Sequence, residues 1–232
     1  MREELSLSSR TFEYATAGVT LPGESESGDR HLVVATRSGI LIAVVDGLGH
    51  GPEAAEASRI AVATLDRHAE ESVVSLVQHC HEEMKATRGA VMSVAALDEQ
   101  DHTVTWLGVG NVEGMLVRAD RAANAPSENF PMLGGIVGYR LPRLQAMVVP
   151  IFARDILIFA TDGIRKDFEQ ELCLDDPLKC NRCPVRGLSG ISAKKLCLDY
   201  SLKQIAESIC AQQSKGTDDA LVLVARYLGG SA

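Results

Sequence analysis

The chain has 232 residues, of which 46% are hydrophobic and 4% are aromatic, and its formal net charge is −8. A hydrophobic fraction of this size supports a packed core, and the length suits one large domain or two small ones. A nucleic-acid partner is not expected, because a phosphate backbone needs a basic surface and this chain is acidic, without a cluster of Lys or Arg.

A membrane partner is not expected either. Every apolar run is shorter than the roughly 20 residues of a membrane-spanning helix. The N-terminal sequence MREELSLSSR is charged and polar, unlike a secretory signal. We therefore expect a cytoplasmic protein whose six cysteines are thiols rather than disulfides.

The first predicted elements are two strands, at 31–37 and 40–46, joined by a turn at Ser38-Gly39. Two helices follow, at 53–70 and at 72–87, and the apolar residues of the second recur at helical spacing. Further along the chain the pattern predicts five strands, one helix and a last strand, at 90–97, 102–110, 113–119, 143–151, 155–163, 200–213 and 220–228.

Successive strands with short connections favour antiparallel sheets with helices packed outside them. No break in composition requires a second domain, so we predict a single domain over 1–232. A polar stretch at 166–199 is expected to form a loop or flap. It contains four cysteines whose spacing leaves two interpretations open, a zinc site or free thiols: Cys173, Cys180, Cys183 and Cys197.

Two apolar strands end in the same pair of residues, Asp46-Gly47 and Asp162-Gly163. Asp-Gly is a favoured hairpin turn, which would explain one occurrence. It explains the pair less well, because neither is followed by a returning strand. Asp46 leads into LGHGP and a helix, and Asp162 leads into IRKDFEQEL.

Other aspartates stand just before strands. Asp218 and Asp219 precede the last strand, and Asp29 precedes the first predicted strand. Since the end of one antiparallel strand lies beside the start of its neighbour, these acids can meet Asp46 and Asp162 at one edge. Such a cluster persists if it holds cations, and oxygen ligands select Mg²⁺, Mn²⁺ or Ca²⁺. The alternative is a set of turn and cap aspartates scattered in space.

Four blocks that contain these acids occur in the order SGDRH, VVDGLGHG, FATDGI and TDDALVLVAR. With them, the chain resembles the metal-dependent serine/threonine protein phosphatases, the PPM family, from about Gly23 to Tyr227. The layout leaves no room for an N-terminal sensor domain and is most similar to a small stressosome phosphatase of the bacterial sporulation-phosphatase branch. The resemblance implies an α+β fold, a four-layer α-β-β-α sandwich of two antiparallel sheets with helices on both outer faces.

The resemblance also implies a site for two ions of Mn²⁺ or Mg²⁺. Asp46 would bridge them, and the Gly47 carbonyl would complete the second ion's shell. Asp162 and Asp218 would hold the first ion, and Asp29 would act on the second, directly or through water. A water that bridges two cations loses its proton near neutral pH and attacks phosphorus. Asp46 and Asp162 are thus the expected catalytic residues.

Two further site residues match the family less well. Asp219 stands where the family often has Asn, and we include it among the expected metal ligands. His50 lies on a glycine-flanked loop and is a candidate general acid, with a loop or packing role as the alternative. The histidine of animal relatives falls at Leu48 instead, and their phosphate-binding arginine has no clear match.

The resemblance implies a phosphoserine and phosphothreonine protein phosphatase. Its expected partner is a phosphorylated regulator of the stressosome or anti-sigma-antagonist type, in bacterial stress signalling. Two alternatives belong to other classes. One is a catalytically inert binding module that keeps the phosphatase fold, and the other is a structural Ca²⁺-binding protein, although no EF-hand spacing is present.

Overall fold

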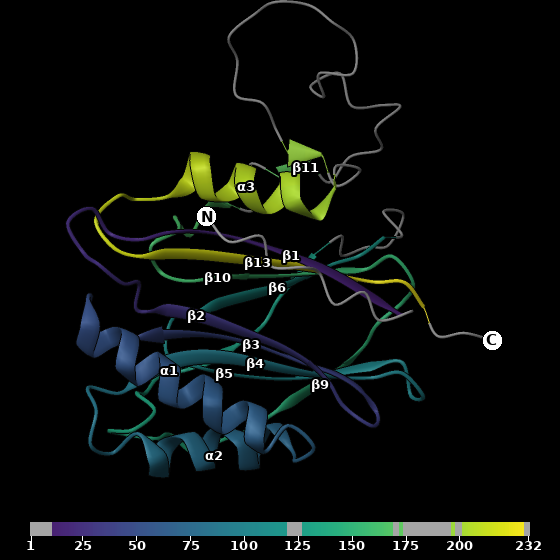
Figure 1. The fold of residues 1–232 in the computed structure, drawn as a ribbon. Helices are drawn as coiled ribbons and strands as arrows, with labels where there is room; N and C mark the ends of the chain where they lie inside the picture. The colour runs from purple at the N-terminus through teal and green to yellow at the C-terminus, as the bar shows by residue number, and fades with distance from the viewer. Residues whose placement is uncertain (1–10, 120–126, 169–171, 174–195, 198–200, 230–232) are drawn as a thin grey trace, which may run out of the picture.

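The computed structural model describes residues 11–119, 127–168, 172–173, 196–197 and 201–229. Two sheets are stacked face to face, with α3 outside one sheet and α1 and α2 outside the other (Figure 1). The predicted four-layer α+β sandwich is therefore confirmed. Of the helices in the described part of the chain, none has the length and hydropathy of a membrane span.

The first sheet has the strand order β1-β13-β10-β6-β7, and all its pairs are antiparallel. Helix α3 (Leu202–Gln213) packs on its outer face against β1 and β13. The strands are β1 (Phe12–Val19), β13 (Ala220–Tyr227), β10 (Ile156–Ala160), β6 (Glu113–Val117) and β7 (Ser127–Asn129).

The second sheet has the order β2-β3-β4-β5-β8, and β9 also pairs with β5. Its pairs are antiparallel except the short β5–β8 pair. Helices α1 (Pro52–Arg67) and α2 (Val73–Glu83) cover its outer face. The strands are β2 (Asp29–Ala35), β3 (Gly39–Gly47), β4 (Ala90–Asp98), β5 (Thr103–Val109), β8 (Met132–Leu133) and β9 (Met147–Pro150).

Local sequence sets the helix starts. Pro52 occupies the first turn of α1, where its missing N–H costs no hydrogen bond. Ser72 caps α2 by accepting a hydrogen bond from the Ser75 N–H. Ser201 and Gln204 form a capping box at the start of α3. Helices α2 and α3 therefore lie within the predicted ranges, and α1 begins one residue before its predicted range; each helix is a few residues shorter than predicted.

The space between the sheets is filled by apolar side chains around Trp106, which is 1% exposed. Its ring stacks on Phe130 with centroids 4.4 Å apart and lies 4.9 Å from the Phe159 ring. A Cβ on Gly114 would lie 1.9 Å from the Trp106 ring, so β6 needs glycine opposite it. Two further apolar clusters lie under α3 and under α1 and α2. The sheets are thus buried on both faces, as their long apolar runs require.

Several features differ from the predicted elements, and the short strands β7 and β8 were not predicted. β1 was not predicted, and it forms the edge of the first sheet beside β13. The predicted strand at 143–151 is shorter, because only β9 pairs with β5 there. Two short strands, β11 (Leu172–Cys173) and β12 (Leu196–Cys197), pair in parallel within the predicted flap. The rest of that segment from residue 169 to 200, with Cys180 and Cys183, lies outside the described residues.

Candidate metal centre

Two of the predicted acids face each other at one end of the second sheet. Asp29 is the first residue of β2, and Asp46 is the last residue but one of β3. They are partners in the antiparallel register of these strands. Each is partly buried. The strand pairing itself therefore brings their carboxylates to one edge.

Two more acids come from the first sheet at the same end of the sandwich (Figure 1, left). Asp162 follows β10, and Asp218 precedes β13, which is the antiparallel neighbour of β10. The cluster is therefore shared between the two sheets, and the packing of one sheet on the other sets its shape.

Thr161 joins the two halves of the cluster. It lies between β10 and Asp162, and its hydroxyl donates a hydrogen bond of 2.7 Å to Asp29 Oδ2 in the other sheet. The same hydroxyl accepts a bond of 2.8 Å from the Leu221 N–H. Sequence reasoning missed Thr161, because its role depends on the packing of one sheet on the other.

An open cavity of about 320 Å³ lies at this end, and Asp46, Asp162 and Asp218 line it together with Asn111. The Asn111 amide nitrogen donates a 2.7 Å hydrogen bond to Asp162 Oδ2. Its Oδ1 is shielded from solvent and accepts no hydrogen bond within the described structure. Sequence reasoning missed Asn111 too, although its position just before β6, which pairs with β10, was a usable signal.

The carboxylates raise one another's pKa values. Burial, followed by the negative charges of Asp29, Asp162 and Asp218, raises the pKa of Asp46 to about 9. Burial raises the pKa of Asp29 to about 7 against the opposing Thr161 hydrogen bond, and neighbouring carboxylates add to the rise. The pKa of Asp218 is also raised, first by burial and then by nearby acids, although the Asp219 N–H and His50 oppose this.

These properties fit a cation site. No Lys or Arg side chain offsets the charge of Asp46 or Asp29 among the described residues that shift their pKa values. A cation would replace the missing positive charge, and the Asn111 oxygen is a further neutral donor near it. Oxygen donors of this kind suit Mg²⁺ or Mn²⁺.

The aspartates do not form a compact group of ligand atoms. In the described part of the chain, three His, Cys, Asp or Glu ligand atoms lie within 4.8 Å of one another at His68 and Glu71, in the connection between α1 and α2, and at His79 on α2, but not among the aspartates. The aspartate oxygens are therefore more widely spread than the ligand atoms of that compact group.

Both Asp-Gly glycines are required by close packing. A Cβ on Gly47 would lie 2.0 Å from the Ala54 carbonyl oxygen, and one on Gly163 would lie 1.8 Å from the Asp219 carbonyl oxygen. A side chain at either position would push away the neighbouring segment. The repeated Asp-Gly therefore reflects a second segment that packs closely against the glycine after each of these two aspartates.

Asp219 points away from the cavity that its neighbour Asp218 lines. It is 4% exposed. Its Oδ1 accepts a 2.8 Å hydrogen bond from the Leu21 N–H, and its Oδ2 accepts one of 2.7 Å from the Gly28 N–H. Both oxygens thus hold the segment that leads into Asp29, so the structure places Asp219 behind the site.

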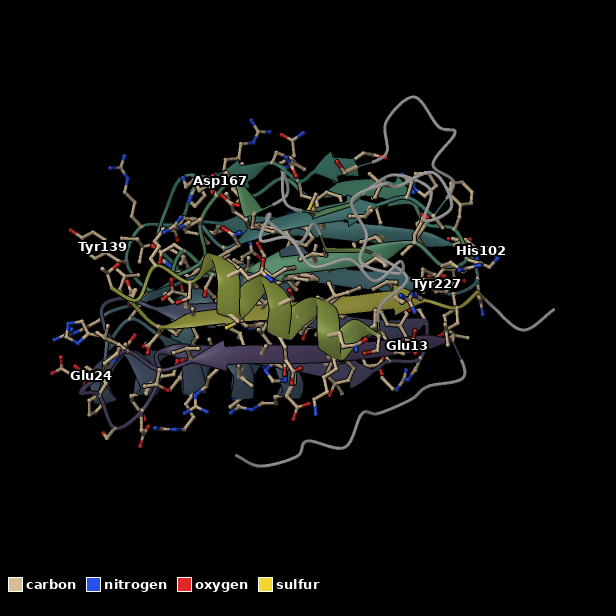
Figure 2. The ribbon with its side chains drawn as sticks, turned by 90° about the horizontal axis from the view of Figure 1, so that it is seen from above. Glu13, Glu24, His102, Tyr139, Asp167 and Tyr227 are labelled. Carbon is tan, nitrogen blue, oxygen red and sulfur yellow. The ribbon has the colours of Figure 1, made fainter. Side chains whose placement is uncertain are left out.

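His50 lies at the rim of the site. Its Nδ1 is 2.6 Å from Glu24 Oε1, and its side chain is 58% exposed. It is near enough to lower the pKa of Asp218, but it does not line the cavity. Figure 2 shows Glu24 and Tyr139 at this end of the molecule, with His102 and Tyr227 at the other.

Two sequence comparisons bear on this site. A model of the family described as stage II sporulation protein E (SpoIIE) matches residues 36–228. The phosphoserine phosphatase RsbX of Bacillus subtilis (strain 168) is 34% identical over 94 residues, which cover 40% of this chain and 47% of that protein. The match thus spans about half the length of this relative.

Solved structures share the fold over nearly the whole chain. A structure from work on the bacterial stressosome as a modular system controlling secondary messenger signalling has a TM-score of 0.74 at 26% identity, covering 93% of this chain and 99% of that chain. RsbX in complex with magnesium has a TM-score of 0.75 at 20% identity, covering 96% and 98%. The PP2C phosphatase domain of SpoIIE from Bacillus subtilis has a TM-score of 0.68 at 19% identity, covering 95% and 64%.

Proposed function

This chain belongs to the SpoIIE family, and on that premise we propose that it is a metal-dependent phosphoserine and phosphothreonine protein phosphatase. The observation that carries the proposal is the cavity lined by Asp46, Asp162 and Asp218. Carboxylates from both sheets meet there, and no Lys or Arg side chain is among the described residues that shift the pKa of Asp46. Repulsion between carboxylates lowers the stability of the fold unless a cation binds there, so its presence favours a metal site over a purely structural role.

We assign five groups to a pair of Mn²⁺ or Mg²⁺ ions. Asp46 would be shared by both ions, Asp162 and Asp218 would hold the first, and Asp29 with the Gly47 carbonyl would hold the second. Such a pair lowers the pKa of a water and offsets charge on the phosphoryl oxygens. Asp219 is left out of this set, because both its oxygens already accept backbone N–H groups.

Other residues of the chain hold these ligands in place. Asn111 restrains the Asp162 carboxylate, and Thr161 restrains that of Asp29. Asp219 fixes the segment before Asp29. Hydrogen-bonded neighbours of metal ligands commonly change metal affinity by about 10- to 100-fold. We therefore expect these three residues to set affinity without touching the reacting phosphate.

We propose a loop role for His50 rather than a general-acid role. Its imidazole is directed to Glu24 at the rim, and it does not line the cavity. Bound cations would make their water acidic, so the site would not need His50 as a proton donor. The ion pair with Glu24 would tie the loop after β3 to the segment between β1 and β2.

The substrate class follows from the relatives. RsbX carries the name of a phosphoserine phosphatase, and another relative comes from work on the stressosome. We propose that this chain removes phosphate from a serine or threonine of a stress-signalling regulator of the stressosome or anti-sigma-antagonist type. We place this reaction in the cytoplasm.

The test is hydrolysis by the purified full chain of p-nitrophenyl phosphate and a phosphoserine peptide. We expect turnover in Mn²⁺ or Mg²⁺, and loss of turnover in Ca²⁺ or in chelator. An absence of turnover with every ion, while the protein remains folded, would favour the inert binding module. The same assay therefore separates the two classes of function.

A further inference from the structure

A short turn, residues 136–140, stands at the mouth of the catalytic cavity. Ile136, at its start, lines the cavity with Gly135. The Arg140 N–H donates a 2.8 Å hydrogen bond to the Ile136 carbonyl, which closes the turn. Side chains on the outer side of this turn therefore lie close to the aspartates that line the cavity.

Contacts with two other elements hold the turn in place. Val137 is fully buried and exchanges two hydrogen bonds with Ala90 at the start of β4, of 3.0 and 2.9 Å. The Gly138 N–H donates a 3.0 Å hydrogen bond to His81 Nδ1 on α2. Hydrogen bonds to a strand and to a helix thus restrain the turn, so the backbone at its tip is held in position.

Tyr139 occupies the tip of this turn and is 80% exposed, more than the other exposed large hydrophobic residues among those described. In Figure 2 it projects outward at the site end. Packing in the core does not account for a large aromatic side chain in this position. Rigid, exposed tyrosines are enriched where proteins bind other proteins, because ring burial then costs little conformational entropy.

Arg88 lies beside the same turn. Gly89, the residue after Arg88, packs against Gly138, the residue before Tyr139, because the Gly89 Cα lies 3.2 Å from where a Cβ on Gly138 would be. Arg88 and Tyr139 are therefore each one residue away from this glycine contact, close to the cavity mouth.

The Arg88 guanidinium also reaches the cavity rim. A Cβ on Gly49, a residue that lines the cavity, would lie 2.8 Å from Arg88 Nη1. The guanidinium forms an ion pair with Glu53 in the first turn of α1, and its side chain remains 52% exposed. It is therefore accessible to an anion entering the cavity, and Glu53 competes with that anion for it.

We propose that Arg88 and Tyr139 form the docking surface for the phosphorylated segment of a protein substrate. Arg88 attracts the phosphate at the rim, and Tyr139 packs against an apolar residue next to the phosphoserine. This inference rests on the proposed function and adds a preference to it. The charge of the Arg88 guanidinium is complementary to that of the phosphate, which would displace Glu53 from it.

The test uses two synthetic peptides, Gly-Leu-pSer-Leu-Gly and Gly-Gly-pSer-Gly-Gly, with capped ends. We expect kcat/KM in Mn²⁺ to be about fivefold higher for the leucine peptide, which corresponds to about 1 kcal/mol. Tyr139→Ala should reduce this ratio to about one, and Tyr139→Phe should keep it. Phe152→Ala is the matched control, because Phe152 is an aromatic residue 60% exposed near His102, at the other end of the sandwich.

Arg88 is tested through inhibition by inorganic phosphate. Arg88→Ala should raise the inhibition constant about fivefold or more, whereas Glu53→Gln, which breaks the same ion pair but keeps the guanidinium, should not raise it. An unchanged constant in Arg88→Ala would overturn the role of Arg88. A leucine preference that survives Tyr139→Ala, or is missing from the wild type, would overturn the role of Tyr139.

Two further outcomes count against the inference. If no peptide is hydrolysed by any variant, the proposed function fails and the docking surface fails with it, whereas turnover without preference overturns the docking surface alone. A wild-type dimer in sedimentation that Tyr139→Ala converts to a monomer would make this surface an interface between two copies, and not a substrate site.

Discussion

The two ends of β10 carry buried or partly buried aspartates in opposite circumstances. Asp155 precedes the strand and is 1% exposed, and its carboxylate has hydrogen-bond donors around it. Its carboxylate accepts hydrogen bonds of 2.9 Å from Arg118 Nη1, 2.8 Å from the Ala119 N–H and 3.0 Å from the Phe152 N–H. Asp162 follows the strand and joins a cluster in which the pKa of Asp46 reaches about 9.

The difference teaches how to separate structural from functional acids. A buried carboxylate with a guanidinium and backbone N–H donors is already neutralised, and removing it leaves Arg118 with Glu128 as its remaining ion-pair partner among the described residues. A set of carboxylates that repel one another is stabilised when a bound cation offsets their negative charge. Substitutions at the two ends should therefore affect different properties, with activity lost at one end and stability lost at the other.

The largest effect is expected for Asp46→Asn. A shared ligand cannot be replaced by a neutral amide, so kcat/KM on a phosphoserine peptide should fall by about 10³-fold or more at saturating Mn²⁺, a loss of several kcal/mol. The metal-free variant should unfold at the same temperature as the wild type or higher, because the amide introduced there does not ionise and so cannot join the repulsion that raises the pKa of Asp46 to about 9. Near-normal turnover would remove Asp46 from the site.

Asp155→Asn should show the opposite pattern. Breaking a buried ion pair should lower the free energy of unfolding by about 3 kcal/mol, measured by urea denaturation in Mn²⁺. Activity per folded molecule should stay close to wild type, because Asp155 is at the far end of the strand. A loss of activity without a loss of stability would contradict the division between the two ends.

Asn111→Ala tests the hydrogen bond that restrains Asp162. Without it, the Mn²⁺ concentration for half-maximal activity should rise by about tenfold, as for other neighbours of metal ligands. Asn111→Leu keeps the side-chain size and should give the same rise. If the leucine variant binds Mn²⁺ like the wild type, Asn111 acts by filling space.

The metal-free protein should lose stability as pH rises. The folded pKa of Asp46 is about 9 and that of Asp29 about 7, both above the 3.8 of a free aspartate. The folded state thus binds more protons than the unfolded state between about pH 4 and pH 9, and its stability falls across that window. Denaturation in chelator at pH 5, 7 and 9 checks this, and Asp46→Asn should show a weaker pH dependence.

The smallest effect is expected for His50→Ala. Turnover of a phosphoserine peptide and of p-nitrophenyl phosphate should each change by less than about twofold. A general acid would give a loss of about 10²- to 10⁴-fold on phosphoserine, whose leaving oxygen is the stronger base. Such a selective loss, with Mn²⁺ affinity unchanged, would show that His50 protonates the leaving group.

Much of the fold was predictable because its signals are local. The apolar runs that became β3 and β10 are continuous, and Pro52 and Ser72 mark the helix starts. β1 was harder, since its sequence FEYATAGV forms a partly buried edge strand without a strong apolar run. Residues of this kind acquire their structure from the neighbouring strand β13.

The candidate site divides in the same way. Asp46 and Asp162 stand out in the sequence because each ends an apolar strand. Asp218 and Asp219 are adjacent, and the sequence cannot tell which one lines the cavity and which one holds the backbone of Leu21 and Gly28. Thr161 also depends on contacts that arise when the two sheets pack, so spacing along the chain does not reveal it.

In the metal-free protein the carboxylates of the site hold protons, and bound cations displace these protons. Calorimetric titration of the metal-free full chain with Mn²⁺ at pH 7, in two buffers of different ionisation enthalpy, counts the protons released on binding. We predict binding with release of about one proton or more in the wild type, and less in Asp46→Asn. Binding without proton release, or no binding in the wild type, would contradict the account.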